Sequence, residues 1–237
     1  MLTVFASQKG GTGKTTLSVI AAVSLFDRFG PKGASIGFID CDPQFQSSGW
    51  VERAEPEISV RRALTKRELE AALRGFRDCD FVIADCPGGD ADANVALLVA
   101  ADLVLVPLNP SGLDFDSTTD DMFGLIQECR KRRRGNPKDV RLILNGLDMR
   151  TRSTKEIIEE SKKLRIPVAR AKIRRLTAFS DSYLGDTVVT RMTDAGEAKA
   201  DAESLMAELF PTWRGRKVAR SRQAGRPKQV SRKGVRT

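Results

Sequence analysis

Short apolar runs alternate with helical stretches along most of this 237-residue chain. The apolar runs are 2–6, 34–39, 81–84, 103–107 and 142–144, with 167–173 as a candidate sixth. Helices are expected at about 15–29, 66–75, 115–133, 154–164 and 194–210. Continuous apolar strands separated by helices are typical of a parallel sheet that is covered on both faces. The pattern therefore predicts an α/β fold with a doubly wound, mostly parallel sheet and helices on both faces.

Polar residues follow several of these runs at the point where each strand should end. They are a glycine-rich loop after the first run, Asp40 and Asp42 after the second, Asp85 after the third and Asn145 after the fifth. In doubly wound sheets, ligands bind at the carboxyl ends of the strands. We therefore expect these residues to meet at one edge of the sheet.

The glycine-rich loop reads SQKGGTGKTT from Ser7 to Thr16. Glycines 10, 11 and 13 allow backbone N–H groups to point at an anion, and the following helix adds the positive end of its dipole. Lys14 would contact the terminal phosphates, the Thr15 hydroxyl would coordinate Mg²⁺, and Thr16 would contact a phosphate oxygen. The whole loop, Thr12 included, is thus predicted to bind ATP or ADP with Mg²⁺. The alternative is a glycine-rich turn whose lysines occur by chance.

The loop departs from the strict pattern G-x-x-x-x-G-K-[ST] at Gln8 and carries an additional lysine, Lys9. K-G-G-x-G-K-[ST] resembles the deviant Walker A motif of the ParA/MinD ATPases, which have the P-loop NTPase fold. The segment Asp40 to Gln44 resembles the family's D-x-D-P-Q switch I, and 107–115 is similar to a segment of short, ParF-like partition ATPases. On these motifs the chain is identified as resembling a ParF-like ParA protein.

The resemblance implies a role for each of the strand-end residues. Lys9 would reach across a nucleotide-sandwich homodimer to the phosphates bound by the other subunit. Asp40 would hold Mg²⁺ through water, and Asp42 would orient or activate the attacking water. Asp85 would be the Walker B aspartate that supports Mg²⁺, and Asn145 would contact the adenine. Gly88 and Gly89, after Asp85, would form a mobile segment that responds to the γ-phosphate.

Basic residues are concentrated at the C-terminal end of the sequence. Ten of the 40 Lys and Arg residues lie in 212–237, which has no Asp or Glu, whereas residues 1–211 carry 30 basic and 31 acidic residues, a net charge of −1. A segment of this composition lacks the apolar residues needed for a core. We therefore expect an ATPase domain over 1–211 and a disordered basic tail over 212–237 that binds DNA electrostatically. A merely solubilising tail is the alternative.

Two further basic clusters and one short motif bear on DNA binding. Lys131 to Arg134 and Arg170 to Arg175 could widen a DNA-binding face, although exposed helix ends often look similar. Gly225 to Lys228 resembles the core of an AT-hook, with Ala224 at a position where such hooks usually carry arginine.

The four cysteines contain no CxxC pair and the chain has no histidine, so reduced structural thiols are favoured over a zinc site or a cluster shared between subunits. No run approaches the eighteen apolar residues of a membrane span, and the chain begins directly with an apolar run. We expect a cytoplasmic, nucleoid-associated protein that does not bind membranes.

The resulting hypothesis is a DNA-partition ATPase. It would form an ATP-dependent dimer, bind DNA without sequence preference, and be reset by slow Mg-dependent hydrolysis stimulated by a ParB-like centromere-binding protein. A nucleotide-gated DNA-binding adaptor with incidental turnover is the second hypothesis. A metabolic P-loop enzyme with a small acceptor is the third.

Overall fold

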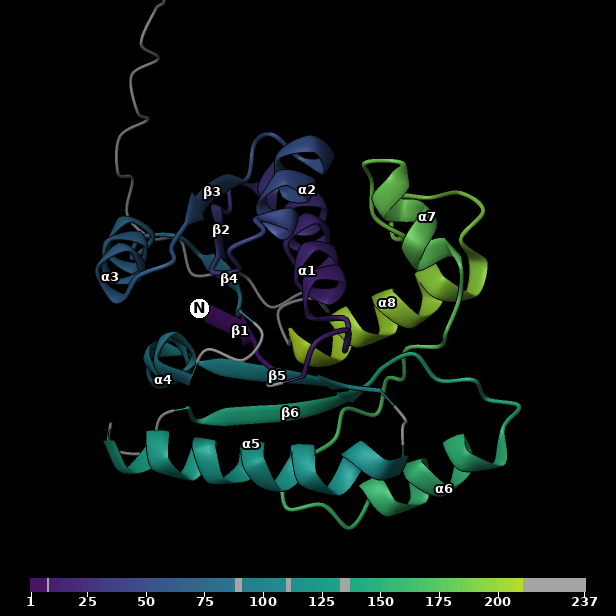
Figure 1. Cartoon of the computed structure of the whole chain (residues 1–237). Coiled ribbons are helices and arrows are strands. Elements are labelled where there is room, and N and C mark those ends of the chain that lie inside the picture. The colour runs from purple at the N-terminus through teal and green to yellow at the C-terminus, as the bar shows by residue number, and fades with distance from the viewer. Residues whose placement is uncertain (8, 88–90, 110–111, 133–136, 211–237) are drawn as a thin grey trace, which may run out of the picture.

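The computed structural model describes residues 1–7, 9–87, 91–109, 112–132 and 137–210 (Figure 1). The strands are β1 Leu2–Phe5, β2 Ile36–Asp40, β3 Ser59–Arg62, β4 Phe81–Asp85, β5 Leu103–Leu108 and β6 Asp139–Leu144. The helices are α1 Lys14–Phe29, α2 Gln46–Ala54, α3 Lys66–Gly75, α4 Ala91–Ala100, α5 Gly112–Arg132, α6 Arg152–Ser161, α7 Ala178–Leu184 and α8 Gly196–Leu209, with a short 3₁₀ helix, η1 Gly30–Lys32, after α1.

The six strands form one sheet in the order β3-β2-β4-β1-β5-β6, and all of the pairings are parallel. The neighbours of β1 in the sheet are β4 and β5, so the chain crosses over the sheet repeatedly between strands. This arrangement confirms the predicted doubly wound α/β fold. It also brings the ends of β1, β2, β4 and β6 to the same edge, as expected for parallel strands.

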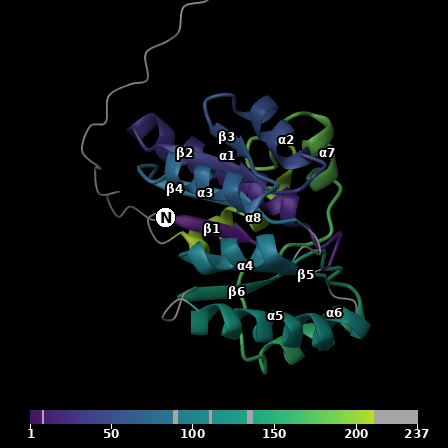
Figure 2. The same ribbon diagram turned by 60° about the vertical axis from the view of Figure 1, so that its left-hand side comes forward.

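Both faces of the sheet are buried. Because successive strand residues point to opposite sides, the strands contribute to two hydrophobic clusters. Phe5, Phe38 and Leu105 belong to one hydrophobic cluster, which also contains residues of α1, α2 and α8. Val4 and Val104 belong to a second cluster with residues of α3, α5 and α6. Figures 1 and 2 show the two corresponding helical layers, one on each side of the sheet. Burial on both faces explains why the strands read as continuous apolar runs.

The sequence prediction missed β3, an edge strand with the sequence SVRR, of which only Val60 is half-buried and the other residues are exposed. An edge strand needs little apolar surface, so its sequence lacks the signal of a buried strand. The predicted sixth strand at 167–173 is wrong. This segment forms isolated parallel bridges, Leu142 with Val168 and Leu147 with Arg174, and otherwise follows β6 as irregular chain.

Three helices were not predicted: α2, α4 and α7. In α2 the sequence QSSGWVERA has low intrinsic helix preference, and the helix is held instead by burial of Trp50 and Val51. By contrast, α3 carries a local signal, because Thr65 and Glu68 form a reciprocal capping box at its start.

No helix of the described residues combines the length and the apolar character that crossing a bilayer requires. The expected domain boundary between residues 211 and 212 stays a prediction, because the basic tail lies outside the described residues.

Candidate nucleotide-binding site

The glycine-rich loop connects β1 to α1 at the carboxyl edge of the sheet. Gly11 and Gly13 have left-handed φ values of 74° and 93°, and α1 begins at Lys14 directly after Gly13. Left-handed backbone is favourable mainly for glycine, which explains the glycines at positions 11 and 13. The Lys14 side chain is folded back over the loop, with Nζ 3.5 Å from the carbonyl oxygen of Lys9.

Two asparagines from neighbouring strand ends fasten the loop. The Asn109 side chain, after β5, donates a hydrogen bond of 2.9 Å to the carbonyl oxygen of Gly11. The Asn145 side chain, after β6, donates one of 2.7 Å to the carbonyl oxygen of Thr12. Asn109 was not singled out in the sequence, where it lies between two prolines and reads as a turn residue.

Thr15 and Asp85 are in direct contact. The Thr15 hydroxyl donates a 2.8 Å hydrogen bond to Asp85 Oδ2, while Asp85 Oδ1 is buried and has no hydrogen-bond partner. Burial raises the pKa of the Asp85 carboxyl from 3.8 to about 7; the Thr15 hydrogen bond lowers it, and the charge of Asp40 raises it. A buried acidic group with an unused oxygen is well suited to a cation that would restore its charge.

Asp40 is the last residue of β2, and Asp42 lies two residues further along the chain. Asp40 is fully buried and pairs in register with Asp85 on β4. Its two oxygens accept hydrogen bonds from backbone N–H groups, Oδ1 from Asp42 at 3.0 Å and Oδ2 from Ser48 at 2.8 Å. Asp42 is half-exposed, and its Oδ1 accepts from the N–H of Gln44 at 2.9 Å.

These residues fit a magnesium ion held together with phosphate. The described residues contain no group of three or more His, Cys, Asp or Glu side chains placed to hold a metal alone. A Mg²⁺ site that takes one or two protein oxygens and completes its shell with phosphate and water needs no such group. The Thr15 hydroxyl and the buried carboxylates of Asp40 and Asp85 provide these oxygens.

The remaining loop residues differ in burial. Thr12 is buried, and its hydroxyl has no hydrogen-bond partner, so it is available to a ligand. Thr16 is half-buried, Lys14 is buried and Lys9 is exposed. Asp85 and Asn145 are thus hydrogen-bonded to the loop, and Asp40 lies beside Asp85. Lys14 is enclosed by the protein, and Lys9 lies at its surface.

Two of the four cysteines lie next to the acidic residues of the site. All four are free, and Cys41 and Cys86 are buried directly after Asp40 and Asp85. Burial raises the pKa of the Cys41 thiol to about 12 and that of Cys86 well above 9.0. Neutral, enclosed thiols fit the expected structural role.

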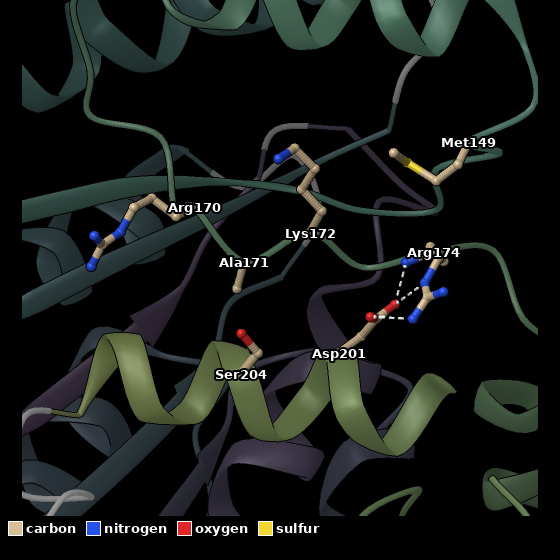
Figure 3. Close-up of a pocket in the computed structure, with 7 residues that line it drawn as sticks. All are labelled: Met149, Arg170, Ala171, Lys172, Arg174, Asp201 and Ser204. Carbon is tan, nitrogen blue, oxygen red and sulfur yellow. Dashed lines mark hydrogen bonds and ion pairs between the residues drawn. The ribbon is translucent and has the colours of Figure 1, made fainter. Parts of the chain in front are cut away.

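A second cluster of basic residues lines a pocket of about 330 Å³ between the 170–174 segment and α8 (Figure 3). Asp201 accepts hydrogen bonds from the backbone N–H and the side chain of Arg174, and Glu208 accepts from the backbone N–H groups of Arg170 and Ala171. Arg174 is therefore occupied. Arg170 is largely exposed, with Nε 3.9 Å from the Glu208 carboxylate, and Figure 3 shows Lys172 pointing away from α8.

The chain is similar to several known nucleotide-binding and partition proteins. Residues 3–188 match the family model described as the CobQ/CobB/MinD/ParA nucleotide binding domain. The chain is 27% identical over 214 residues to the "Maintenance of carboxysome distribution protein A" of Halothiobacillus neapolitanus, covering 87% of this chain and 95% of that protein. It is 32% identical over 114 residues to "Protein ParA" of Rhizobium radiobacter, covering 47% and 50% of the two chains. Among solved structures, an ATP complex of McdA from Cyanothece aligns with a TM-score of 0.66 at 18% identity over 88% of this chain and 95% of that one.

Proposed function

Because the chain belongs to the CobQ/CobB/MinD/ParA nucleotide-binding family, we propose that it is a partition-type ATPase. It dimerises around two Mg-ATP molecules, binds DNA without sequence preference in that state, and is reset by slow hydrolysis that a ParB-like partner stimulates. The observation that carries this proposal is the direct hydrogen bond between Thr15, at the start of α1, and the buried Asp85. It joins the phosphate loop to an acidic pair, Asp40 and Asp85, that suits Mg²⁺.

The proposed roles of Lys14 and Lys9 follow from how deeply each side chain is buried. Lys14 neutralises phosphate within its own subunit, because it is enclosed beside the loop. Lys9 is exposed and acts on the nucleotide of the partner subunit, so that charge neutralisation is tied to dimer formation. Asp42 orients the attacking water, and Asn145 contacts the adenine. When bound, Mg²⁺ would supply electrostatic stabilisation of the charge that develops on the phosphates.

DNA binding is assigned to the basic tail, residues 212–237, with Arg170 and Lys172 as additional phosphate contacts. The tail supplies ten positive charges in 26 residues. Arg170, whose side chain is 92% exposed, and Lys172 add charge on the body of the protein next to the pocket in Figure 3. A polyanion such as DNA is the partner that this distribution favours.

Three substitutions test the ATPase proposal. Lys14→Ala should abolish ATP binding, Asp42→Ala should trap an ATP-bound dimer, and Lys9→Ala should spare binding but weaken the dimer. Light scattering with ATP gives the oligomeric state, and phosphate release gives turnover. Lys32→Ala, an exposed lysine after the opposite end of α1, is the matched control. Normal ATP-dependent dimerisation and turnover in Lys9→Ala would contradict the cross-subunit role.

A second candidate function is a nucleotide-gated positioning adaptor with incidental turnover. It is favoured by the similarity to a carboxysome distribution protein over 95% of that protein's length. Turnover measured with DNA and with the product of a neighbouring gene separates the two. A several-fold stimulation supports partition, and unchanged turnover supports the adaptor.

A further inference from the structure

Arg62, at the end of edge strand β3, contacts the loop that carries the two switch I aspartates. Parallel pairing sets Arg62 beside Asp40 in register. Its Nε donates a 2.9 Å hydrogen bond to the Ser48 hydroxyl, and its guanidinium carbon lies 5.4 Å from the centre of the Phe45 ring. A third contact, 2.9 Å long, joins one of its terminal nitrogens to Glu52.

Phe45 is in an unfavourable backbone conformation. It is the residue before α2 and has φ 51° and ψ 30°, in the left-handed region that side chains with a Cβ rarely adopt. The conformation therefore depends on contacts with its surroundings. Arg62 supplies one of them by lying over the ring, at a distance typical of a cation–π interaction.

Ser48 connects Arg62 to the buried Asp40. The Ser48 hydroxyl donates to the carbonyl oxygen of Phe45 at 3.1 Å while it accepts from Arg62. Its backbone N–H donates to Asp40 Oδ2, and the other oxygen of Asp40 accepts from the N–H of Asp42. A continuous set of hydrogen bonds thus runs from Arg62 through Ser48 and Asp40 to Asp42.

We propose that Arg62 is a positioning residue that fixes the Asp40–Phe45 loop and thereby orients Asp42 for the reaction. Arg62 acts through its contacts with Ser48 and Phe45. The reaction itself rests on the proposed ATPase function, whereas the ordering of the loop is a property of the nucleotide-free chain. Removing Arg62 should loosen the Ser48 N–H bond to Asp40 without removing any group of the phosphate loop.

The neighbouring residue offers a matched control. Arg61 lies on the same strand with its guanidinium carbon 5.2 Å from the centre of the Phe76 ring, so it makes the same kind of contact with a different ring. Arg61→Ala removes a comparable cation and leaves the Asp40–Phe45 loop untouched. Glu52→Gln is a second control, because it removes the ion pair of Arg62 but keeps the Ser48 and Phe45 contacts.

Hydrogen–deuterium exchange on the nucleotide-free full chain tests the ordering of the loop. In Arg62→Ala the hydrogen-bonded backbone amides of residues 42, 44, 45 and 48 should exchange about tenfold faster than in wild type, and in Arg61→Ala and Glu52→Gln they should not. Arg62→Lys keeps the positive charge but loses the Nε bond, and should fall between. Equal exchange in Arg62→Ala and Arg61→Ala would overturn the proposal.

Steady-state ATP turnover tests the consequence. Arg62→Ala should lower kcat about tenfold, the scale expected for a misplaced reacting group, while KM for ATP stays within about twofold. An unchanged kcat in Arg62→Ala would overturn the assigned effect on Asp42, and a loss reproduced by Arg61→Ala would do the same. If wild type shows no turnover at all, the proposed ATPase function fails, and exchange still decides whether Arg62 orders the loop.

Discussion

Asn145 and Thr12 lie 133 residues apart in the sequence and are joined by a 2.7 Å hydrogen bond from the Asn145 side-chain amide to the Thr12 carbonyl oxygen. The bond fastens the phosphate loop to the end of β6. The same bond commits one amide hydrogen of Asn145 to the loop while its carbonyl oxygen stays available for a ligand. The observed anchoring role and the proposed base contact would therefore fall on the same side chain.

Comparison with Asn109 separates these roles. Asn109 fastens Gly11 by an equivalent bond of 2.9 Å. Losing one such bond costs about 1 kcal/mol, so Asn109→Ala and Asn145→Ala should each weaken ATP binding roughly five- to tenfold. If Asn145 also contacts adenine, Asn145→Ala alone should reduce the preference for ATP over GTP. Titration of both variants with fluorescent ATP and GTP measures this, and an unchanged preference would restrict Asn145 to the anchoring role.

Gly13→Ala should destabilise the nucleotide-free protein. A Cβ there would lie 2.2 Å from the Asn145 amide nitrogen, and the φ of 93° is unfavourable for alanine by about 1–2 kcal/mol. Displacing Asn145 adds the loss of a hydrogen bond, so Tm should fall by at least about 4 °C. Gly10→Ala is the control, since its Cβ would meet no atom within 4 Å and its φ is not left-handed. Equal Tm values for the two variants in a thermal melt would contradict the steric argument.

Much of this architecture could be predicted because buried strands and phosphate loops have strong local signals. The runs at β1, β2, β4, β5 and β6 are apolar because both sides of each strand are covered. Lys14, Thr15, Asp40 and Asp85 could be predicted from spacing and resemblance to lie at one site, and in the structure they lie close together.

Other features depend on contacts that the sequence does not show. β3 is a polar edge strand, and α2 forms because Trp50 and Val51 are buried, so neither has a clear periodic pattern. The roles of Asn109 and Arg62 depend on which strand ends lie side by side. These contacts follow from the strand order β3-β2-β4-β1-β5-β6, which the sequence alone does not give.

The raised pKa of Asp85 predicts a specific pH dependence of stability. Between the ordinary value of 3.8 and about 7, the folded protein holds a proton at Asp85 that the unfolded chain has released. The free energy of unfolding should therefore decrease as pH rises through this range, by an amount on the order of a few kcal/mol. The stabilising effect of Asp85→Asn should appear at pH 8 and be absent at pH 4.

Urea unfolding of both proteins in EDTA without nucleotide measures this difference. The chain has no histidine, so few other side chains titrate in the upper part of this range. The carboxyls that titrate near pH 4 are common to both proteins, so their effect cancels in the stability difference. The raised pKa of Asp85 would be contradicted if wild type and Asp85→Asn differed in free energy of unfolding by the same amount at pH 4 and at pH 8.

DNA binding should be strongly dependent on salt if the tail provides most of the contacts. If about six of the ten tail charges neutralise phosphates, affinity should fall roughly a thousandfold between 50 and 200 mM salt. Replacing the tail's Lys and Arg residues by Gln in the full chain should remove most of this dependence. Replacing Arg170 and Lys172 by Ala should reduce the slope of log affinity against log salt by at most about two, since each removes one charge. Fluorescence anisotropy with duplexes of different sequence, measured with ATP and with ADP, distinguishes these contributions.

Substitution of Arg174 is not suitable for this test, because its ion pairs with Asp201 and Glu197 hold the 170–174 segment against α8. A slope that survives loss of the tail charges but not of Arg170 and Lys172 would move the DNA-binding surface from the tail to the body of the protein.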